Sequence, residues 1–352
     1  MRRLALFATA ILLSASVFVR AGADDLVLSR FGDYLDALRG QAGIPGLAAT
    51  IIRDGEATWE GAYGRMDVER AIATRADTPF EIDGITQLFT ASLILRCAEE
   101  GKLSLDDPIG LLAKDAPEPG ATLRQILTHT SLTPDGLVYS YRPERLNSLV
   151  ETVAACRGMS FRAAVAELLD RFAMVDSMPG LNSLTLVPPA DNVTVDDITR
   201  YTALVDRLAR PYSVDSQRRS TLSQYVATGL TPASGLVTTV RDLARFDTAL
   251  RRGVVVQPAS LATAWTPPLD RNAQRLPHGI GWFVQNYNTE RIVWQFGVSD
   301  NASSSLIITV PSRGMTMIML ANSSGLAKPY QFPAGDVLVS PFARLFLAIF
   351  VR

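Results

Sequence analysis

Few side chains in this 352-residue sequence stand where they could perform nucleophilic or acid–base chemistry. Thr86 carries a hydroxyl close to the carboxyl group of Asp83, and three consecutive serines occupy positions 303–305. A hydroxyl becomes a nucleophile when a base stands within hydrogen-bond reach, and the sequence holds just two histidines, His129 and His278. Attack by a hydroxyl is therefore the chemistry to test, although no titratable base stands at a known spacing from the serines.

The composition excludes several kinds of site. A zinc site of the usual kind needs four nitrogen or sulfur ligands, which would consume both histidines and both cysteines. The sequence has 34 basic and 35 acidic residues and a formal net charge of -1, so it lacks the excess of basic residues that is typical of nucleic-acid-binding proteins. The sequence contains no glycine-rich phosphate loop and no dinucleotide-binding fingerprint. We therefore expect no cofactor, no metal and no nucleic-acid partner.

The start of the chain predicts export. Arg2 and Arg3 precede a mostly apolar run over residues 4–19, and Ala21–Ala23 form a small-residue cleavage site. The alternative is a membrane anchor, but the run is shorter than the roughly 20 residues that span a bilayer. The sequence thus predicts a signal peptide over residues 1–23, no stable membrane span after its cleavage, and a periplasmic or extracellular location.

The two cysteines, Cys97 and Cys156, would meet an oxidising compartment after export, where a disulfide is allowed. Both lie in strongly apolar helical patterns, and buried free cysteine is common. This favours two buried free thiols over a disulfide.

Hydrophobic periodicity predicts strands near both ends of the chain and helices between them. The predicted strands are 46–52, 57–63, 280–286, 291–294, 304–310 and 315–321, and the predicted helices are one ending at Gly40, 85–98, 123–129, 145–156, 161–172, 195–208, 240–251 and an apolar one at 342–351. The helix over 85–98 is apolar on nearly every face, so it should run through the middle of the molecule. No strand alternation is found between residues 103 and 230.

These patterns predict an α/β (α+β) fold with an antiparallel sheet that is flanked by helices and built from both chain ends. The expected division is a discontinuous sheet domain over residues 24–99 and 233–352, with an inserted, mostly helical domain over 100–232.

Several segments form an ordered set of motifs. They are FEIDGITQLFTA at 80–91, EEGKLSLDDP at 99–108, LRQILTHTS at 123–131, ASGLVTTVRDLARF at 233–246, GIGW at 279–282 and LANS at 320–323. Together they resemble the serine β-lactamase and penicillin-binding-protein superfamily, especially its class C-like and esterase-like branch. The resemblance covers nearly the whole mature chain and implies a β-lactamase/transpeptidase-like fold.

In that family a serine attacks the substrate carbonyl, and a lysine one helical turn later, in an S-x-x-K motif, assists removal of the hydroxyl proton. The resemblance places Gly84 at the serine position and Gln87 at the lysine position. Glycine has no side chain to acylate, and glutamine does not titrate. In the third motif, WQFG at 294–297 stands where the branch has WHYG, so Gln295 takes the histidine position and Gly297 is kept.

The resemblance also implies a catalytic tyrosine. Counting back from GMSF at 158–161 places it at Tyr141, with Pro143 as the third residue of that motif. A competing register uses Tyr139 and leaves Tyr141 in the asparagine place. No residue is thus a confident catalytic group apart from the retained Tyr141, and the candidate ligand cleft consists of Gly84, Gln87, Tyr141, Pro143, Gln295 and Gly297.

Other polar residues could rescue catalysis or could be structural. Thr86 lies two positions beyond the serine place and points to another side of the helix, so we expect it to pack. Asp83 either lines the pocket or caps the helix that begins there, and the cap is favoured. We expect the serines at 303–305 on a surface strand, with some facing solvent, and both His129 and His278 in structural roles.

The leading hypothesis is an exported β-lactamase-related pseudoenzyme whose cleft still binds a ligand. A peptidoglycan-like peptide, a small acyl ligand such as a β-lactam-like amide, or a partner protein would be its occupant. The alternative is an active serine-hydrolase-type enzyme, namely a β-lactamase, D-Ala-D-Ala peptidase or esterase, with a relocated nucleophile or direct attack by water. A third hypothesis, a purely structural protein, predicts a collapsed pocket filled by side chains.

Overall fold

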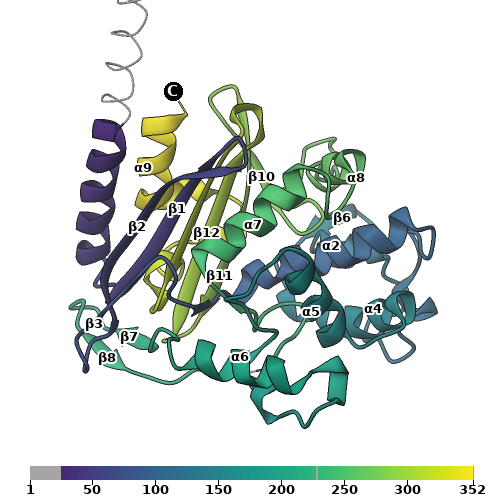
Figure 1. Cartoon of the computed structure of the whole chain (residues 1–352). Helices are drawn as coiled ribbons and strands as arrows, with labels where there is room; N and C mark the ends of the chain where they lie inside the picture. The colour runs from purple at the N-terminus through teal and green to yellow at the C-terminus, as the bar shows by residue number, and fades with distance from the viewer. Residues whose placement is uncertain (1–24, 227–228, 352) are drawn as a thin grey trace, which may run out of the picture.

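The computed structural model describes residues 25–226 and 229–351, and its centre is a seven-stranded antiparallel sheet (Figure 1). The order of its strands is β10–β11–β12–β13–β1–β2–β3, and they comprise β1 Gly46–Arg53, β2 Glu56–Asp67, β3 Ile72–Ala73, β10 Phe283–Tyr287, β11 Glu290–Ser299, β12 Ser303–Val310 and β13 Met315–Ala321. In register, Thr50 of β1 faces Ile318 of β13 on one side and Glu60 of β2 on the other. The sheet therefore joins both ends of the chain, as predicted. The predicted signal peptide over 1–23 lies outside the described residues.

The remaining elements are mostly helices. The α-helices are a helix over 25–41, α2 Thr86–Glu99, α3 Leu123–Leu127, α4 Leu149–Arg157, α5 Phe161–Arg171, α6 Val195–Val205, α7 Val240–Arg251, α8 Pro258–Ala264 and α9 Pro341–Phe350. Short strand pairs are β4 Phe80–Glu81 with β9 Val237–Thr238, β5 Thr130–Thr133 with β6 Gly136–Tyr139, and β7 Tyr212–Val214 with β8 Ser220–Leu222. The 3-10 helices used below are η1 Asp83–Ile85 and η3 Pro143–Ser148.

Helices cover both faces of the sheet (Figure 1). On one face, the helix over 25–41 and α9 bury Phe31 and Phe346 in the same cluster as Leu306 of β12. On the other face, α2 and α7 share a cluster with Ile307 and Ile318. Burying each such side chain contributes about 1.5–3 kcal/mol. Because both faces are covered, β12 and β13 are buried at every residue.

The sequence predictions agree closely in some elements and are wrong in others. The helix predicted over 240–251 and the strand over 315–321 are α7 and β13 residue for residue. The prediction that the middle of the chain holds no strands is wrong, because the β5–β6 and β7–β8 hairpins lie there. These strands are short, and β8 is exposed throughout, so no alternation marks them. The division at residues 100 and 232 stays a prediction, since one buried cluster joins the sheet to α2, α4 and α5.

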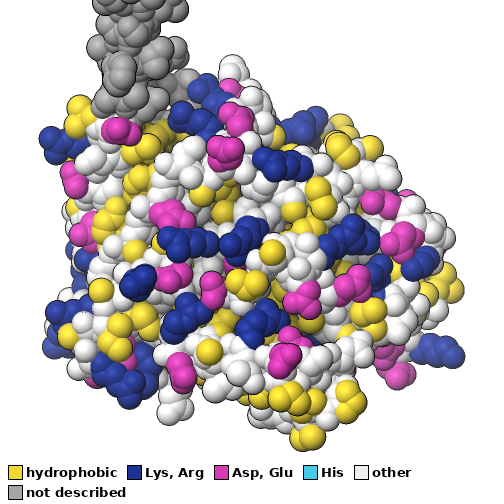
Figure 2. Space-filling model, viewed as in Figure 1, with side chains coloured by type: hydrophobic (Ala, Val, Ile, Leu, Met, Phe, Trp, Pro, Cys, Tyr) yellow, Lys and Arg dark blue, Asp and Glu magenta, His cyan; other side chains and the backbone are white. Residues whose placement is uncertain are grey.

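Charged side chains of both signs are interspersed over the face seen in Figure 2, with no extended area of one sign. An ion pair joins Arg241 on α7 to Glu60 on β2, with their nitrogen and oxygen 2.7 Å apart. Of the helices in the described part of the chain, none is both long and apolar enough to cross a bilayer.

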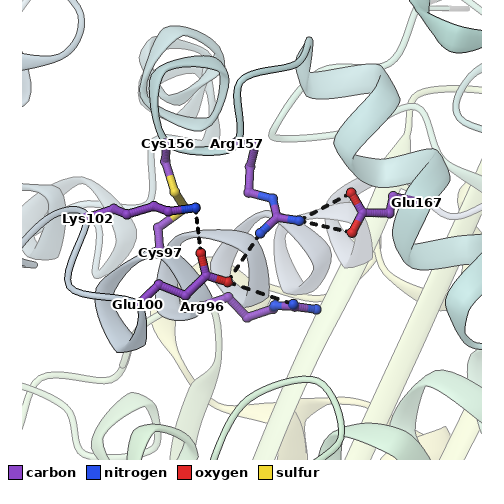
Figure 3. The surroundings of a disulfide bond; sticks show 7 residues. All are labelled: Arg96, Cys97, Glu100, Lys102, Cys156, Arg157 and Glu167. Carbon is purple, nitrogen blue, oxygen red and sulfur yellow. Dashed lines mark hydrogen bonds and ion pairs between the residues drawn. A yellow bond between two sulfur atoms is a disulfide. The ribbon is translucent and has the colours of Figure 1, made fainter.

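A disulfide joins Cys97 on α2 to Cys156 on α4 (Figure 3). The prediction of two free thiols is therefore wrong. The two apolar helical patterns that suggested isolated buried thiols belong to helices that contact each other, and the Cα atoms of the cysteines lie 6.1 Å apart, which a disulfide spans. Beside the bond, Glu100 forms ion pairs with Lys102 at 2.7 Å and with Arg157 at 3.3 Å.

Removing this disulfide is expected to lower the free energy of unfolding by about 2–4 kcal/mol. The bond joins residues 59 positions apart, so it restricts a long loop in the unfolded chain. The measurement is denaturant unfolding of the wild type with and without reductant. The Cys97→Ala/Cys156→Ala variant is the control, because reductant should leave its midpoint unchanged. Equal midpoints for the oxidised and reduced wild type would contradict the prediction.

Candidate functional site

Four stretches of the chain meet around one cleft of about 510 Å³, and three of them carry residues predicted from the sequence. Gly84 and Gln87 come from η1 and the start of α2, Tyr141 and Pro143 from the segment that leads into η3, and Gly297 from β11. Five of the six predicted cleft residues thus lie together. A cleft of this volume falls within the size range of small-molecule sites.

Gly84 and Gly297 hold η1 directly against β11. A Cβ atom built on Gly84 would lie 2.4 Å from the carbonyl oxygen of Phe296, and one built on Gly297 would lie 2.2 Å from that of Ile82. Both distances are far below van der Waals contact, so neither position accepts a side chain unless the backbone shifts. The position that the family resemblance assigns to the serine therefore lacks both a hydroxyl and the room for one.

Gln87 belongs to a chain of hydrogen bonds that fixes its donors and acceptors. The backbone N–H of Arg142 donates to His129 Nδ1 at 3.2 Å, so the ring proton lies on Nε2. That Nε2 donates to Gln87 Oε1 at 3.2 Å, and Gln87 Nε2 donates to the hydroxyl oxygen of Tyr141 at 2.8 Å. The described residues offer no acceptor to the Tyr141 hydroxyl proton, so this proton is available to a group bound in the cleft.

The three side chains that these hydrogen bonds join, those of His129, Gln87 and Tyr141, are all uncharged near neutral pH. Burial, together with the neighbouring His278, lowers the pKa of His129 well below its ordinary value. Burial raises the pKa of Tyr141, and the hydrogen bond from Gln87 offsets only part of that rise. A general base works best when its pKa lies near the operating pH, which is true of neither residue. This series of hydrogen bonds therefore positions the neutral Tyr141 hydroxyl as a hydrogen-bond donor.

The same hydrogen bonds favour one of the two tyrosine registers. The Tyr141 hydroxyl meets Gln87 at the cleft, whereas the Tyr139 hydroxyl donates to the carbonyl oxygen of Pro333 at 2.9 Å. Tyr139 is also absent from the cleft lining among the described residues. The geometry therefore matches Tyr141 to the family's tyrosine position.

Asp83 lines the cleft and does not cap a helix, contrary to the favoured prediction. Its backbone lies in the left-handed region, with φ 47°, and its carboxylate accepts a hydrogen bond of 2.7 Å from Ser303 Oγ. Aspartate is among the residues that tolerate this region. Burial raises the pKa of Asp83 to about 7, against the opposing effect of the Ser303 hydrogen bond. A carboxyl group that titrates near neutral pH thus stands beside the empty serine position.

A second buried carboxyl group, that of Glu81, interacts with Asp83. Glu81 is 2% exposed, and its Oε2 has no hydrogen-bond partner in the described part of the chain. Burial, together with the charge of Asp83, raises the pKa of Glu81 to about 9. This pair was not among the site residues predicted from the sequence. The spacing of the two residues could have indicated the pair, because side chains two positions apart in an apolar, strand-like segment are expected on one face.

Two further expectations about side-chain direction are wrong. Gln295 does not line the cleft: it is fully buried, its Nε2 donates to the Gly281 carbonyl at 3.0 Å, and its Oε1 accepts from the Phe296 backbone N–H. The serines at 303–305 were expected in part at the surface, but all three are buried because β12 is an inner strand with both faces covered. Ser305 Oγ, for example, donates to the Ile82 carbonyl at 2.7 Å.

Thr86 and His278 occupy the structural roles expected of them. The Thr86 hydroxyl is fully buried and accepts a hydrogen bond from the Leu236 backbone N–H at 3.3 Å. The His278 ring donates through Nδ1 to the Gly279 carbonyl at 2.7 Å, and burial lowers the pKa of His278 to about 3. Across residues 25–226 and 229–351, no group of three or more His, Cys, Asp or Glu side chains is arranged to hold a metal ion.

Similar proteins were found among curated sequences and solved structures. Protein flp of Staphylococcus aureus (strain MW2) is 24% identical over 79% of this chain, and penicillin-binding protein 4* of Bacillus subtilis (strain 168) is 22% identical over 76%. The matched region spans 60% of the length of protein flp and 66% of that of the Bacillus protein.

Two solved structures share the fold. The octameric penicillin-binding protein homologue from Pyrococcus abyssi superposes with a TM-score of 0.72 at 19% identity, over 91% of this chain and 77% of that one. A class C β-lactamase from Rhodobacter sphaeroides gives 0.67 at 18% identity, over 92% and 99%. The family model described as Beta-lactamase matches residues 31–338. This match covers most of the chain, and the chain therefore belongs to the Beta-lactamase family.

Proposed function

We propose that this protein is a non-catalytic member of the Beta-lactamase family whose cleft binds a small ligand without forming an acyl-enzyme. The observation that carries the proposal is the contact at Gly84, where a Cβ atom would lie 2.4 Å from the Phe296 carbonyl oxygen. An acyl-enzyme needs a side-chain nucleophile, and this position has neither the nucleophile nor space for it.

The neutral chain around Gln87 supports the same proposal. Where the family resemblance implies a lysine, an amide is fixed between His129 and Tyr141 by hydrogen bonds of 3.2 and 2.8 Å. An amide cannot take up the proton of a nucleophile. The loss of the nucleophile in a serine hydrolase typically costs about 10⁶-fold in kcat, so ordinary turnover would require a replacement apparatus.

We also propose that the protein is exported. Two observations support this: the signal-like sequence over residues 1–23, and the Cys97–Cys156 disulfide, which is typical of proteins outside the reducing cytoplasm. The two curated relatives belong to bacteria and include a penicillin-binding protein by name.

The proposal is tested by turnover assays with nitrocefin and p-nitrophenyl acetate. We expect no hydrolysis above the buffer blank for the wild type or for the Tyr141→Phe/Thr86→Ala double variant, which lacks the cleft hydroxyl of Tyr141 and the hydroxyl inside the first family motif. Hydrolysis by the wild type that the double variant loses would overturn the proposal and support a hydrolase with a relocated nucleophile.

A further inference from the structure

The side chains around the cleft include carboxyl groups but no cationic group. Three carboxyl groups line it, namely those of Asp83, Glu144 and Asp300, and no lysine, arginine or histidine of the described residues does so. Lys328 forms an ion pair with Asp300 at 3.0 Å. Within the same residues, neither Asp83 nor Glu144 has an ion-pair partner. The carboxyl groups of the cleft without a cationic partner are therefore those of Asp83 and Glu144.

The basic residues that follow Tyr141 in the chain do not serve the cleft. Arg145 forms a 2.8 Å ion pair with Glu118 and also donates to the Thr130 carbonyl, and Arg142 pairs with Glu118 at 3.4 Å and binds Ser131 Oγ. Both guanidinium groups thus pair with Glu118, and neither arginine lines the cleft. A ligand carboxylate entering the cleft would meet like charges and no cation, which costs free energy instead of supplying it.

Asp83 presents a free acceptor to the cleft. It is 5% exposed, its Oδ2 is occupied by Ser303, and no donor of the described residues reaches its Oδ1. Glu144 is exposed at the same cleft, and the charges of both groups act on Tyr141. Tyr141 itself offers a hydroxyl proton. The cleft therefore combines two carboxyl acceptors that suit a cation with a tyrosine hydroxyl donor that suits a neutral carbonyl.

We infer that the cleft binds a small organic amine, with its ammonium group between Asp83 and Glu144 and a neutral carbonyl oxygen on the Tyr141 hydroxyl. This inference rests on the proposed function, because it names the ligand class of the same non-hydrolytic cleft. It disfavours the ligands first expected from the family resemblance, such as β-lactams or peptides that present a free carboxylate.

Three probes that differ only in charge test the inference. They are N-benzylpropanamide, its 3-amino derivative, which is an ammonium ion, and its 3-carboxy derivative, which is a carboxylate. Binding to the full-length mature protein is measured by calorimetry at pH 8, where Asp83 is mostly ionised. We expect the amine to bind at least about tenfold more tightly than the neutral amide, because a modest charge attraction is enough to produce that ratio of affinities. The carboxylate should bind most weakly of the three.

Matched variants locate the preference. Asp83→Asn and Glu144→Gln should each reduce the ratio of amine to neutral affinity, and their combination should bring it close to one. Glu151→Gln should preserve the ratio, since this exposed carboxyl group does not line the cleft. If Asp83→Asn does not fold, as judged by circular dichroism, the exposed Glu144→Gln variant still provides the test.

The outcomes separate the inference from the proposed function. Tighter binding of the carboxylate, no binding of any probe at millimolar concentration, or an unchanged ratio in the folded variants would each overturn the inference alone. Release of benzylamine from a probe would show amide hydrolysis and overturn the proposed function.

Discussion

Restoring the missing serine by Gly84→Ser is expected to lower the free energy of unfolding by about 3 kcal/mol and to leave the protein unreactive towards β-lactams. The reason is steric. The added Cβ atom would lie 2.4 Å from the Phe296 carbonyl oxygen and 3.4 Å from Gln87 Nε2, so η1 would have to move away from β11. The measurement is denaturant unfolding, combined with a test for acylation by a fluorescent penicillin.

Two controls separate this steric effect from the polarity of serine and from a general effect of replacing glycine. Gly84→Ala should cost nearly as much as Gly84→Ser, because the Cβ atom alone causes the conflict. Gly120→Ala should be close to neutral, since a Cβ atom there meets nothing within 4 Å. A Gly84→Ser protein that is as stable as the wild type would show that η1 yields easily, and the steric part of the account would be wrong.

Glu81→Gln is expected to stabilise the protein at alkaline pH by about 3 kcal/mol, because glutamine is the neutral isostere of a carboxylate that is buried at 2% exposure with one oxygen unpartnered. Ionising Glu81 in the folded state is costly for two reasons, burial and the neighbouring Asp83. The variant removes that cost and leaves the shape of the side chain nearly unchanged.

The sign of the pH dependence follows from the direction of the shift. The pKa of Glu81 rises from 4.5 to about 9 on folding, so the folded state binds the proton more tightly than the unfolded state does. The stability that this proton contributes is fully present below about pH 4.5 and is lost as the pH rises towards 9. The gain from Glu81→Gln should therefore be near zero at pH 5 and largest at pH 8–9.

Unfolding curves of the wild type and of Glu81→Gln at pH 5, 7 and 9 check this expectation. Glu151→Gln, at an exposed position on α4, is the matched control and should change little at any pH. An equal gain from Glu81→Gln at all three pH values would mean that Glu81 is not protonated in the folded protein.

The parts of the fold that could be predicted from the sequence are those with strong periodicity. α7 carries apolar residues on one face and β13 is a long apolar run between turn signals, so both were located to the residue. The β7–β8 hairpin could not be found in this way, because its strands are three residues long and mostly outside the core. Motif order placed Gly84, Gln87, Tyr141, Pro143 and Gly297 at one cleft, and the structure brings these five together.

Side-chain direction was harder to predict than position. Gln295 lies on a cleft strand, but its amide turns to the Gly281 carbonyl, a partner 14 residues away in sequence. Asp83 resembled a helix cap, but a left-handed backbone and Ser303, 220 residues away, direct its carboxylate differently. The disulfide likewise depends on the packing of α2 against α4. Each of these features is set by contacts between distant segments, which local patterns do not contain.

Intact-protein mass spectrometry after incubation with penicillin G, and separately with a fluorophosphonate, is the most direct test of the claim that no acyl-enzyme forms. We expect the mass of the native protein to stay unchanged with both reagents, because Gly84 offers no nucleophile and its backbone leaves no room for one. A one-to-one adduct that forms on the native protein and not on the unfolded chain would contradict it.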